Sequence, residues 1–503
     1  MRFVPLGLWA LLGLHVSGCT PTPQSFPSEP PPPPEAPAPT AEAPKPKTFH
    51  YPPAPPGKAV DTMHGVTVAD PYRWLESSDD SGALAWTVLE SELARSQLDR
   101  PEREGLRKRL AELHDYGRAW GHVRRGGALF FFRNEGLQAQ ASYWVKADAR
   151  AEARPLVDAG TVGEGGSASL PWAAPSNDGK SVAYAVARAG SEYQEVWVKD
   201  AKTGREAPDR LTRLRQPALA WAKDGKGFYY SNHPALGAEG EGAPGPRLLF
   251  HRLGEPVEKD RVVFEASERA ALVRPLVSED GAWLVIVAGK GGDAGPHEVH
   301  AADLRRGEAK PFALLKNEGH AYRAVEVVDE RLVLITGRDA PRGRLAAIDL
   351  RKAAAKPGGD PALEDLVPQP AEGGVVRAAA VAGKKLLVET LEKAKSVLSV
   401  YDLKGKPEGK VTLPGAGALA GLAGRPSDPE ALVEYASFTE PRAAYGYNVA
   451  KKELKPFFKP TPKFDPSGYV VEQVSYPLLK EGARATMFLV HRKDITPDGS
   501  RLT

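Results

Sequence analysis

Hydrophobic and polar positions alternate in short runs along residues 129–449, and the same kind of run returns at a regular interval. Such alternation is typical of β-strands that bury one face. The runs, each ending close to a polar turn, are Tyr143–Asp148, Val196–Asp200, Leu249–Leu253, Val299–Asp303, Leu345–Asp349, Leu398–Asp402 and Ala444–Asn448. Their last residues are 52, 53, 50, 46, 53 and 46 positions apart, which predicts seven copies of one β unit.

A period of about 50 residues is typical of the blade of a β-propeller, which has four antiparallel strands. Asp-Gly pairs keep the same period, because Asn177–Lys180, Lys223–Lys226 and Glu279–Gly281 each precede an apolar run. Asp-Gly favours a hairpin turn, since glycine takes positive φ without steric cost. The chain is therefore predicted to be mainly β, with a seven-bladed β-propeller over residues 121–465. A β-sandwich with coincidental spacing is the alternative.

Two helices are predicted ahead of the propeller, within residues 57–120. The first follows the N-cap candidates at 77–80 and has apolar residues near helical spacing, at Leu84, Val88, Leu89 and Leu93. The second begins near Pro101, a residue favoured in the first helical turn. Its apolar face carries Leu106, Leu110 and Leu113.

Composition and charge exclude several classes of function. The 503 residues are 42% hydrophobic and 26% charged, which is typical of a soluble globular protein, and the net charge is only +3. No basic stripe with interleaved aromatic residues is present, so nucleic-acid binding is not predicted. The single cysteine excludes an intrachain disulfide framework and a cysteine-rich zinc site.

That cysteine lies at the end of a predicted secretory signal, residues 1–18. Arg2 precedes the apolar run Val4–Val16, which is too short to span a bilayer as a helix, and small residues follow. Val16–Cys19 resembles the bacterial lipoprotein box, which implies cleavage before Cys19 and acylation of its thiol. The expected location is the bacterial cell envelope, lipid-anchored at the outer membrane or periplasmic face, or secreted. An ordinary secretory signal with an incidental cysteine is the alternative.

Residues 19–56 are predicted to form a proline-rich tether. Sixteen prolines lie between Thr20 and Pro56. Proline cannot donate to a β-ladder, and such runs adopt extended polyproline conformations, so the stretch is expected to act as a semi-rigid spacer. Attached to a lipidated Cys19, it would hold the globular part away from the membrane.

The most specific short motif is Asp70–Glu76, which reads Asp-Pro-Tyr-Arg-Trp-Leu-Glu. This motif, followed by two helices and a seven-bladed propeller, resembles the prolyl oligopeptidase family of serine peptidases. Further similar motifs are Asp178–Tyr184, Trp221–Ser231, His251–Gly254, Thr336–Leu345, Ser437–Pro441, Tyr469–Val474 and Met487–His491. The resemblance covers the chain from about Tyr51 to its end.

The resemblance implies a two-domain enzyme in which a propeller limits access to a catalytic α/β-hydrolase domain. That domain would carry a Ser, Asp and His triad and cleave short proline-containing peptides on the carboxyl side of proline. Residues 51–113 would contribute to it, and residues 466–503 would be its first strands. No cofactor is implied, and we expect a monomer. Residues 477–486 depart from the family pattern, which leaves this entry segment less certain.

No catalytic residue is assigned in the 503 residues. A hydrolase of this class places its nucleophile in Gly-x-Ser-x-Gly, and no serine here completes that pattern. The eleven histidines form no recognisable constellation with a serine. His251 and His491 match strand positions of the family, and His297 and His300 are expected on opposite faces of a strand. No metal-binding motif is found either.

Two interpretations follow. In the first, the chain is the N-terminal and propeller part of a prolyl oligopeptidase-like enzyme, ends before the catalytic region, and is inactive alone. In the second, it is a non-catalytic, surface-tethered propeller that binds peptides or proteins. The second interpretation requires the apolar segment 470–490 to pack on the propeller, because an unpaired strand edge is an aggregation hazard.

Overall fold

The computed structural model describes residues 49–495 and 498, except positions 78, 163–167, 189, 234–244, 268–271, 291–294, 372, 479–481 and 483. The predicted signal sequence, Cys19 and most of the proline-rich stretch lie outside the described residues. The chain divides after Arg100 into two compact units. None of the described helices is long and apolar enough to cross a membrane.

The described part of the first unit consists of a β-hairpin, a short 3₁₀ helix and an α-helix. These are β1 (Val60–Met63), β2 (Val66–Ala69), η1 (Arg73–Glu76) and α1 (Ser81–Leu98). Arg73 of η1 ties the 3₁₀ helix to the hairpin. Its Nε donates to Asp70 Oδ2 at 3.0 Å, and its Nη1 donates to Asp61 Oδ1 of β1 at 3.0 Å. The Asp70–Glu76 motif therefore fastens the hairpin to the start of the helical segment.

Helix α1 begins where the sequence predicts, because Asp80 is its N-cap and accepts a hydrogen bond from the Ala83 N–H at 2.9 Å. Within the first unit, however, most of its predicted apolar stripe is not covered. The exposed members are Leu84, Val88 and Leu89.

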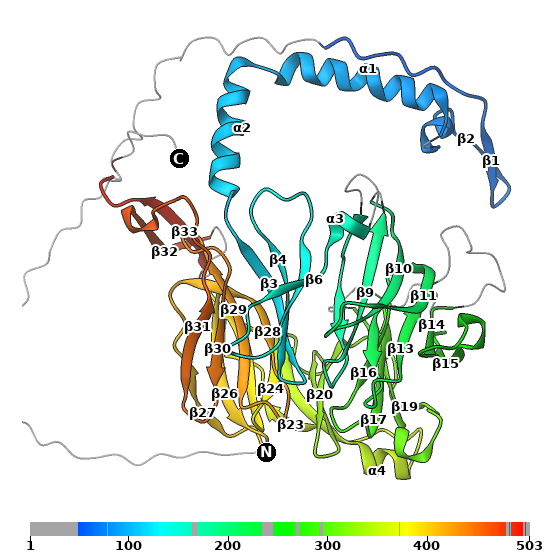
Figure 1. The fold of residues 1–503 in the computed structure, drawn as a ribbon, viewed down its shortest axis with the longest axis vertical. Helices are drawn as coiled ribbons and strands as arrows, with labels where there is room; N and C mark the ends of the chain where they lie inside the picture. The colour runs from blue at the N-terminus through cyan, green and yellow to red at the C-terminus, as the bar shows by residue number, and fades with distance from the viewer. Residues whose placement is uncertain are drawn as a thin grey trace, which may run out of the picture. The chain divides into compact units, whose positions relative to one another are not determined.

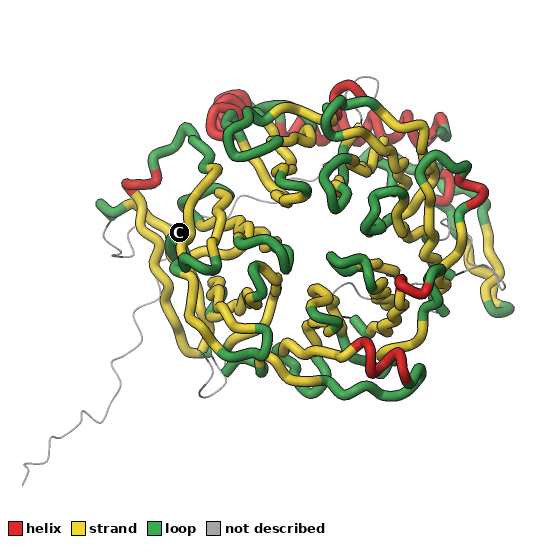
Figure 2. The backbone as a smooth tube through the Cα atoms, turned by 60° about the horizontal axis from the view of Figure 1, so that its bottom comes forward, coloured by secondary structure: helices red, strands yellow, loops and turns green. Residues whose placement is uncertain are grey.

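The second unit begins with helix α2 (Pro101–His114) and continues with seven sheets of four or five strands (Figures 1 and 2). Blades 1 to 3 are β3 (Arg118–Arg125), β4 (Ala128–Asn134), β5 (Ser142–Lys146), β6 (Arg154–Val157); β7 (Ala168–Ser169), β8 (Ala173–Pro175), β9 (Ser181–Arg188), β10 (Tyr193–Asp200), β11 (Glu206–Arg215); and β12 (Leu219–Trp221), β13 (Gly227–Asn232), β14 (Arg247–Arg252), β15 (Arg261–Glu265). The short helix α3 (Ala159–Val162) joins blades 1 and 2.

Blades 4 to 7 are β16 (Leu272–Val277), β17 (Trp283–Gly289), β18 (His297–Asp303), β19 (Phe312–Leu315); β20 (Tyr322–Val328), β21 (Arg331–Thr336), β22 (Arg344–Asp349), β23 (Glu364–Val367); β24 (Gly374–Ala382), β25 (Lys385–Glu392), β26 (Lys395–Asp402), β27 (Pro407–Val411); and β28 (Gly417–Ala423), β29 (Glu430–Ser437), β30 (Ala443–Asn448), β31 (Glu453–Phe458). Helix α4 (Leu350–Ala355) follows β22. All pairings within the blades are antiparallel, so the predicted seven-bladed propeller is confirmed.

The seven runs that revealed the repeat are the third strands of the seven blades, β5, β10, β14, β18, β22, β26 and β30. Their polar last residue has a structural cause. In six blades it is Asp or Asn, and its side-chain oxygen accepts backbone N–H groups of the following turn, as Asp200 accepts from Lys202 at 3.0 Å and Asn448 from Lys451 at 2.9 Å. The repeat is therefore a strand followed by a side-chain-capped turn.

The turns define two faces of the propeller. Turns between first and second strands lie on what we call the lower face, at the bottom of Figure 1, and include Gly179, Gly225 and Gly281, with φ between 67° and 73°. The predicted Asp-Gly hairpins are thus confirmed. Turns between second and third strands lie on the opposite, upper face. In blade 2, β7 and β8 both pair with β9 and together take the place of a first strand, so the chain crosses every blade four times. It therefore both enters at β3 and leaves at β31 on the upper face.

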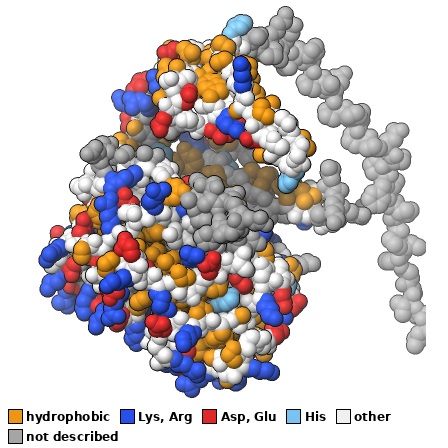
Figure 3. All heavy atoms as spheres, turned by 90° about the vertical axis from the view of Figure 1, so that its right-hand side faces the viewer, with side chains coloured by type: hydrophobic (Ala, Val, Ile, Leu, Met, Phe, Trp, Pro, Cys, Tyr) orange, Lys and Arg blue, Asp and Glu red, His pale blue; other side chains and the backbone are white. Residues whose placement is uncertain are grey.

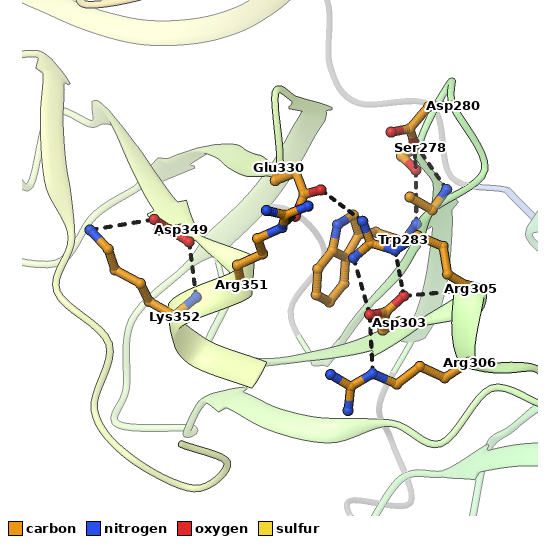
Figure 4. A network of polar contacts seen from close by, with 11 residues as sticks. Ser278, Asp280, Trp283, Asp303, Arg305, Arg306, Glu330, Asp349, Arg351 and Lys352 are labelled. Carbon is orange, nitrogen blue, oxygen red and sulfur yellow. Dashed lines mark hydrogen bonds and ion pairs between the residues drawn. The ribbon is translucent and has the colours of Figure 1, made fainter. Parts of the chain in front are cut away.

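Apolar side chains fill the space between consecutive blades. Among the described residues, six buried apolar clusters each span one pair of neighbours, from blades 1 and 2 to blades 6 and 7. The cluster between blades 4 and 5 contains Trp283, which is fully buried. At its edge the Arg305 guanidinium lies 5.2 Å from the Trp283 ring and donates to Glu330 at 2.7 Å (Figure 4).

The seam between blades 7 and 1 is built differently. None of the six apolar clusters spans these two blades. Strand β3 lies against β28, β29 and β30, and it forms polar pairs with two glutamates of β29. His122 lies 2.6 Å from Glu434 through its Nδ1 and donates to it through its backbone N–H at 2.9 Å, and both residues are buried. Arg124 pairs with Glu430 at 2.9 Å.

After the propeller the chain forms a separate two-stranded hairpin, β32 (Tyr469–Pro477) and β33 (Arg484–Arg492). The apolar segment that includes Met487 and Val490, predicted to need a strand partner, pairs as β33 with β32. The Phe488 ring packs on Phe438 of blade 7 at 5.1 Å, whereas Met487 and Val490 are exposed. The hairpin thus contacts blade 7 through Phe488 and blade 6 through a hydrogen bond from Gln473 to the Lys393 carbonyl, while part of its apolar surface stays exposed.

Candidate functional site

The histidines considered from the sequence lie on strands. His297 on β18 is buried and accepts from the Tyr322 N–H at 3.1 Å, while His300 is only partly buried beside Phe264. His251 on β14 lies between two buried carboxylates, Asp260 at 2.8 Å and Asp209 at 3.1 Å. Burial alone would lower the pKa of His251, but these two acids outweigh it and raise the pKa. The ring thereby links blades 2 and 3.

The outer wall of the propeller offers no obvious site on the side drawn in Figure 3, where acidic and basic side chains are intermixed. The lower face, in contrast, has a candidate site. A cavity of about 790 Å³ lies there, lined by turns of six blades, which is possible only at the central axis. Its lining includes Asn177, Lys223, Glu279, Asp329, Lys384 and Arg425. We call this cavity the lower mouth.

Blade 7 reaches across the lower mouth. In its first turn, Arg425 forms an ion pair with Glu279 of blade 4 at 2.9 Å and donates to the backbone carbonyl of Asn177 in blade 2 at 3.3 Å. Ser427 adds a backbone hydrogen bond to Glu279 at 3.0 Å and a short one from its hydroxyl. Blades 7 and 4 lie on opposite sides of a seven-membered ring, so these contacts cross the axis. We call them the latch.

Near the latch lies a group of half-buried charged side chains. Glu326 on β20 is held there, and burial raises its pKa to about 7, although the Val327 N–H, Arg125 and Arg425 favour its ionised form. Burial also lowers the pKa of Arg125 on β3 and raises that of Asp428 beside the latch. The axis of the propeller is therefore crossed at this end by charged, partly buried side chains, where the pKa of each group is sensitive to its partners.

Sequence reasoning missed these residues as a group. Glu279 was recognised only as part of an Asp-Gly turn, and Arg425 and Glu326 carried no motif. Glu279 and Ser427 are 148 positions apart, and only the ring brings them together. The predicted lipidation residue, Cys19, lies outside the described residues. A turn signal in blade 4 opposite a charged turn in blade 7 was the one available clue.

Comparisons with known proteins agree with this architecture. Residues 52–460 match the family model described as prolyl oligopeptidase, N-terminal beta-propeller domain. The chain therefore belongs to the prolyl oligopeptidase family. It is 26% identical over 458 residues to a prolyl endopeptidase of Elizabethkingia meningoseptica, covering 90% of this chain and 63% of that protein. It is 24% identical over 461 residues to a prolyl endopeptidase of Elizabethkingia miricola, covering 91% and 63%.

Solved structures of the family have the same fold. A structure from a study of two prolyl endopeptidases superposes with a TM-score of 0.78 at 30% identity, over 89% of this chain and 65% of that chain. Prolyl oligopeptidase B from Galerina marginata, bound to a 35-residue hydrolysis and macrocyclization substrate, gives 0.76 at 21%, over 90% and 66%. The present chain thus spans about 63% of the length of the curated relatives named above.

Proposed function

We propose that this chain is the N-terminal propeller part of a prolyl oligopeptidase-type serine endopeptidase that cleaves short peptides after proline. The propeller would select substrates by size, and the chain alone, without a triad, would be inactive. The observation that carries the gating role is the latch, in which Arg425 and Glu279 cross the axis at the lower mouth. A closed lower mouth would keep large or folded chains out of the channel.

Exposed apolar surface supports the presence of a covering catalytic domain in the complete enzyme. In the second unit, Leu106 and Leu110 of α2 are 64% and 56% exposed, and Met487 and Val490 of the hairpin are 42% and 44% exposed. Clusters of exposed large apolar side chains mark interaction surfaces. A hydrolase domain that continues from β33 on the upper face would bury them.

The first test is the size of the native protein together with labelling by a fluorophosphonate, which reacts with activated serines. The proposal predicts a labelled species larger than 54.0 kDa by a whole domain. An unlabelled species of about that mass would contradict catalysis and favour a non-catalytic propeller that binds peptides or proteins.

The gating role is tested in the labelled enzyme by Glu279→Ala, which removes the acceptor of the latch. Cleavage of long proline-containing peptides should rise relative to short ones, because the lower mouth then opens more easily. Lys384→Ala is the matched control, since Lys384 lines the same mouth but makes no salt bridge in the described part of the chain. An unchanged ratio for Glu279→Ala would contradict gating at this mouth.

We further propose that acylation of Cys19 anchors the protein at the bacterial cell envelope, with the proline-rich stretch as a spacer. The support is the lipoprotein-box pattern that ends at Cys19. In cells given radioactive palmitate, the native protein should be labelled and a Cys19→Ser variant should not. Equal labelling of both would contradict the anchor.

A further inference from the structure

A second cavity lies at the upper face, between blades 5 and 6. It encloses about 470 Å³ and is lined by β20, β24 and the turn between β21 and β22. Three of its lining side chains are arginines, Arg323, Arg342 and Arg377, and none of its described lining residues is acidic. We call it the arginine pocket. Because β20 and β24 are the first strands of neighbouring blades and contact each other, the pocket borders the central channel.

A β-bulge places Arg377 in the pocket. Val376 pairs with Thr390 and Ala378 with Glu389, which leaves Arg377 as the extra residue of β24. A bulge bends its strand and redirects the side chain of the extra residue, and bulges are frequent beside functional sites. Arg377 is exposed and makes no salt bridge within the described residues.

Arg342 is held against the same strand by its backbone. Its carbonyl accepts from the Val376 N–H at 2.9 Å. The next residue, Gly343, has φ of 78°, and a Cβ there would lie 3.2 Å from the Val376 side chain, so glycine permits the close approach. The Arg342 Nε is buried and has no hydrogen-bond partner among the described residues. A buried donor without a partner is costly, which favours a bound acceptor.

The charge around the pocket is positive. Glu389 is one carboxylate near Arg323 and Arg377; burial raises its pKa, while the Ser396 hydroxyl donates to it. Within the described residues, Arg342 and Arg377 form no salt bridge and no acidic residue lines the pocket, so the pocket presents positive charge. Arg338, in the same turn as Arg342, differs because it pairs with Asp360 at 3.6 Å and Glu318 at 4.0 Å.

We propose that the arginine pocket binds a carboxylate of an oligopeptide in the channel. Guanidinium groups match a carboxylate with two parallel hydrogen bonds, and apolar residues beside them, Ile335, Val375 and Leu391, can receive a neighbouring side chain. The proposal rests on the proposed function in that peptides enter the channel. The carboxylate is either the C-terminus of the peptide or an internal Asp or Glu side chain.

The test is calorimetric binding to the full 503-residue chain of three short proline-containing peptides with otherwise neutral side chains. One has a free C-terminal carboxylate, one has a C-terminal amide, and one has the amide and an internal glutamate. We expect the free acid or the glutamate peptide to bind at least about ten times more tightly than the neutral amide. Arg342→Gln and Arg377→Gln should abolish this preference, whereas Arg338→Gln should retain it.

Each outcome has one meaning. Preference for the free acid identifies the C-terminus as the ligand, and preference for the glutamate peptide identifies a side chain; either supports the proposal. Equal binding of all three peptides, or a preference unchanged in Arg342→Gln, overturns it. Thermal unfolding of each variant excludes loss of fold, and Arg342→Lys should retain part of the preference. Because binding is measured without a catalytic domain, it stands or falls independently of fluorophosphonate labelling.

Discussion

The interface between blades 4 and 5 and the seam between blades 7 and 1 occupy equivalent places in the ring but are built from different side chains. The first is an apolar cluster around Trp283, and charged residues remain at its edge. The second buries His122 and Glu434. Apolar packing is nondirectional and gains free energy from any close fit, whereas a buried, hydrogen-bonded polar pair is favourable only with both partners in place. The contact that closes the ring therefore depends on both His122 and Glu434 being present.

The largest effect is expected in the apolar interface. Trp283→Ala removes a fully buried ring and should lower the free energy of unfolding by about 3–5 kcal/mol, as measured by urea denaturation. Leu137→Ala is the control, since Leu137 is 60% exposed and should change stability by less than about 0.5 kcal/mol. A cost for Trp283→Ala no larger than that of the control would show that this interface does not carry the stability of the ring.

The seam should fail in a different way. Glu434→Ala leaves the His122 donors without their acceptor and should cost about 3 kcal/mol. Replacing both residues by apolar ones, Glu434→Leu with His122→Phe, should cost less than the single change. A double variant less stable than Glu434→Ala would contradict the view that the pair is conditional.

The same pair predicts a pH dependence. Burial alone would raise the pKa of Glu434, but hydrogen bonds from His122 outweigh it, and the pKa lies below its ordinary value of 4.5. A carboxyl whose pKa is lowered by folding stabilises the protein above its unfolded pKa and loses this effect as the pH falls. Below pH 4.5, the difference in the free energy of unfolding between wild type and Glu434→Ala, measured by urea denaturation, should therefore become smaller. A gap that does not change with pH would contradict this coupling.

A smaller effect of opposite sign is expected at the lower mouth. The pKa of Glu326 is about 7 in the folded protein and near 4.5 when the chain unfolds, so ionisation between these values favours unfolding. As the pH rises from 5 to 8, the free energy of unfolding of Glu326→Gln should increase relative to that of wild type by on the order of 1–2 kcal/mol. The exposed Glu258→Gln should show no such trend. Equal stability differences at both pH values would refute the burial of an ionisable Glu326.

The smallest effect is expected at the charged edge of blades 4 and 5. Arg351→Ala breaks the ion pair with Glu330 seen in Figure 4, but the Arg351 side chain is 72% exposed. Exposed pairs contribute little, so the change in stability should stay within about 0.5 kcal/mol. Lys352→Ala, which breaks the still more exposed pair with Asp349, is the comparison variant. A loss of more than about 1.5 kcal/mol in the free energy of unfolding of Arg351→Ala would show that this exposed edge stabilises the protein as much as a buried contact does.

Local chemistry explains what the sequence alone determined. The third strands and their capping Asp residues, the Asp-Gly turns and the Asp80 helix cap depend on residues only a few positions apart, so a repeat of seven such units and both helices could be predicted. The family motifs belong to the same local features. Nothing in that pattern fixed which face of a blade meets which neighbour.

The tertiary structure decided the remaining features because they join distant residues. Closing the ring brings His122 to Glu434, Arg425 to Glu279 and the bulged Arg377 beside Arg342, each from different blades. Separations of this length leave no periodic signal in a single sequence, since the side chains involved are isolated charges. Whether such a charge faces solvent, a partner or a channel depends on burial, and burial exists only once the seven blades have assembled.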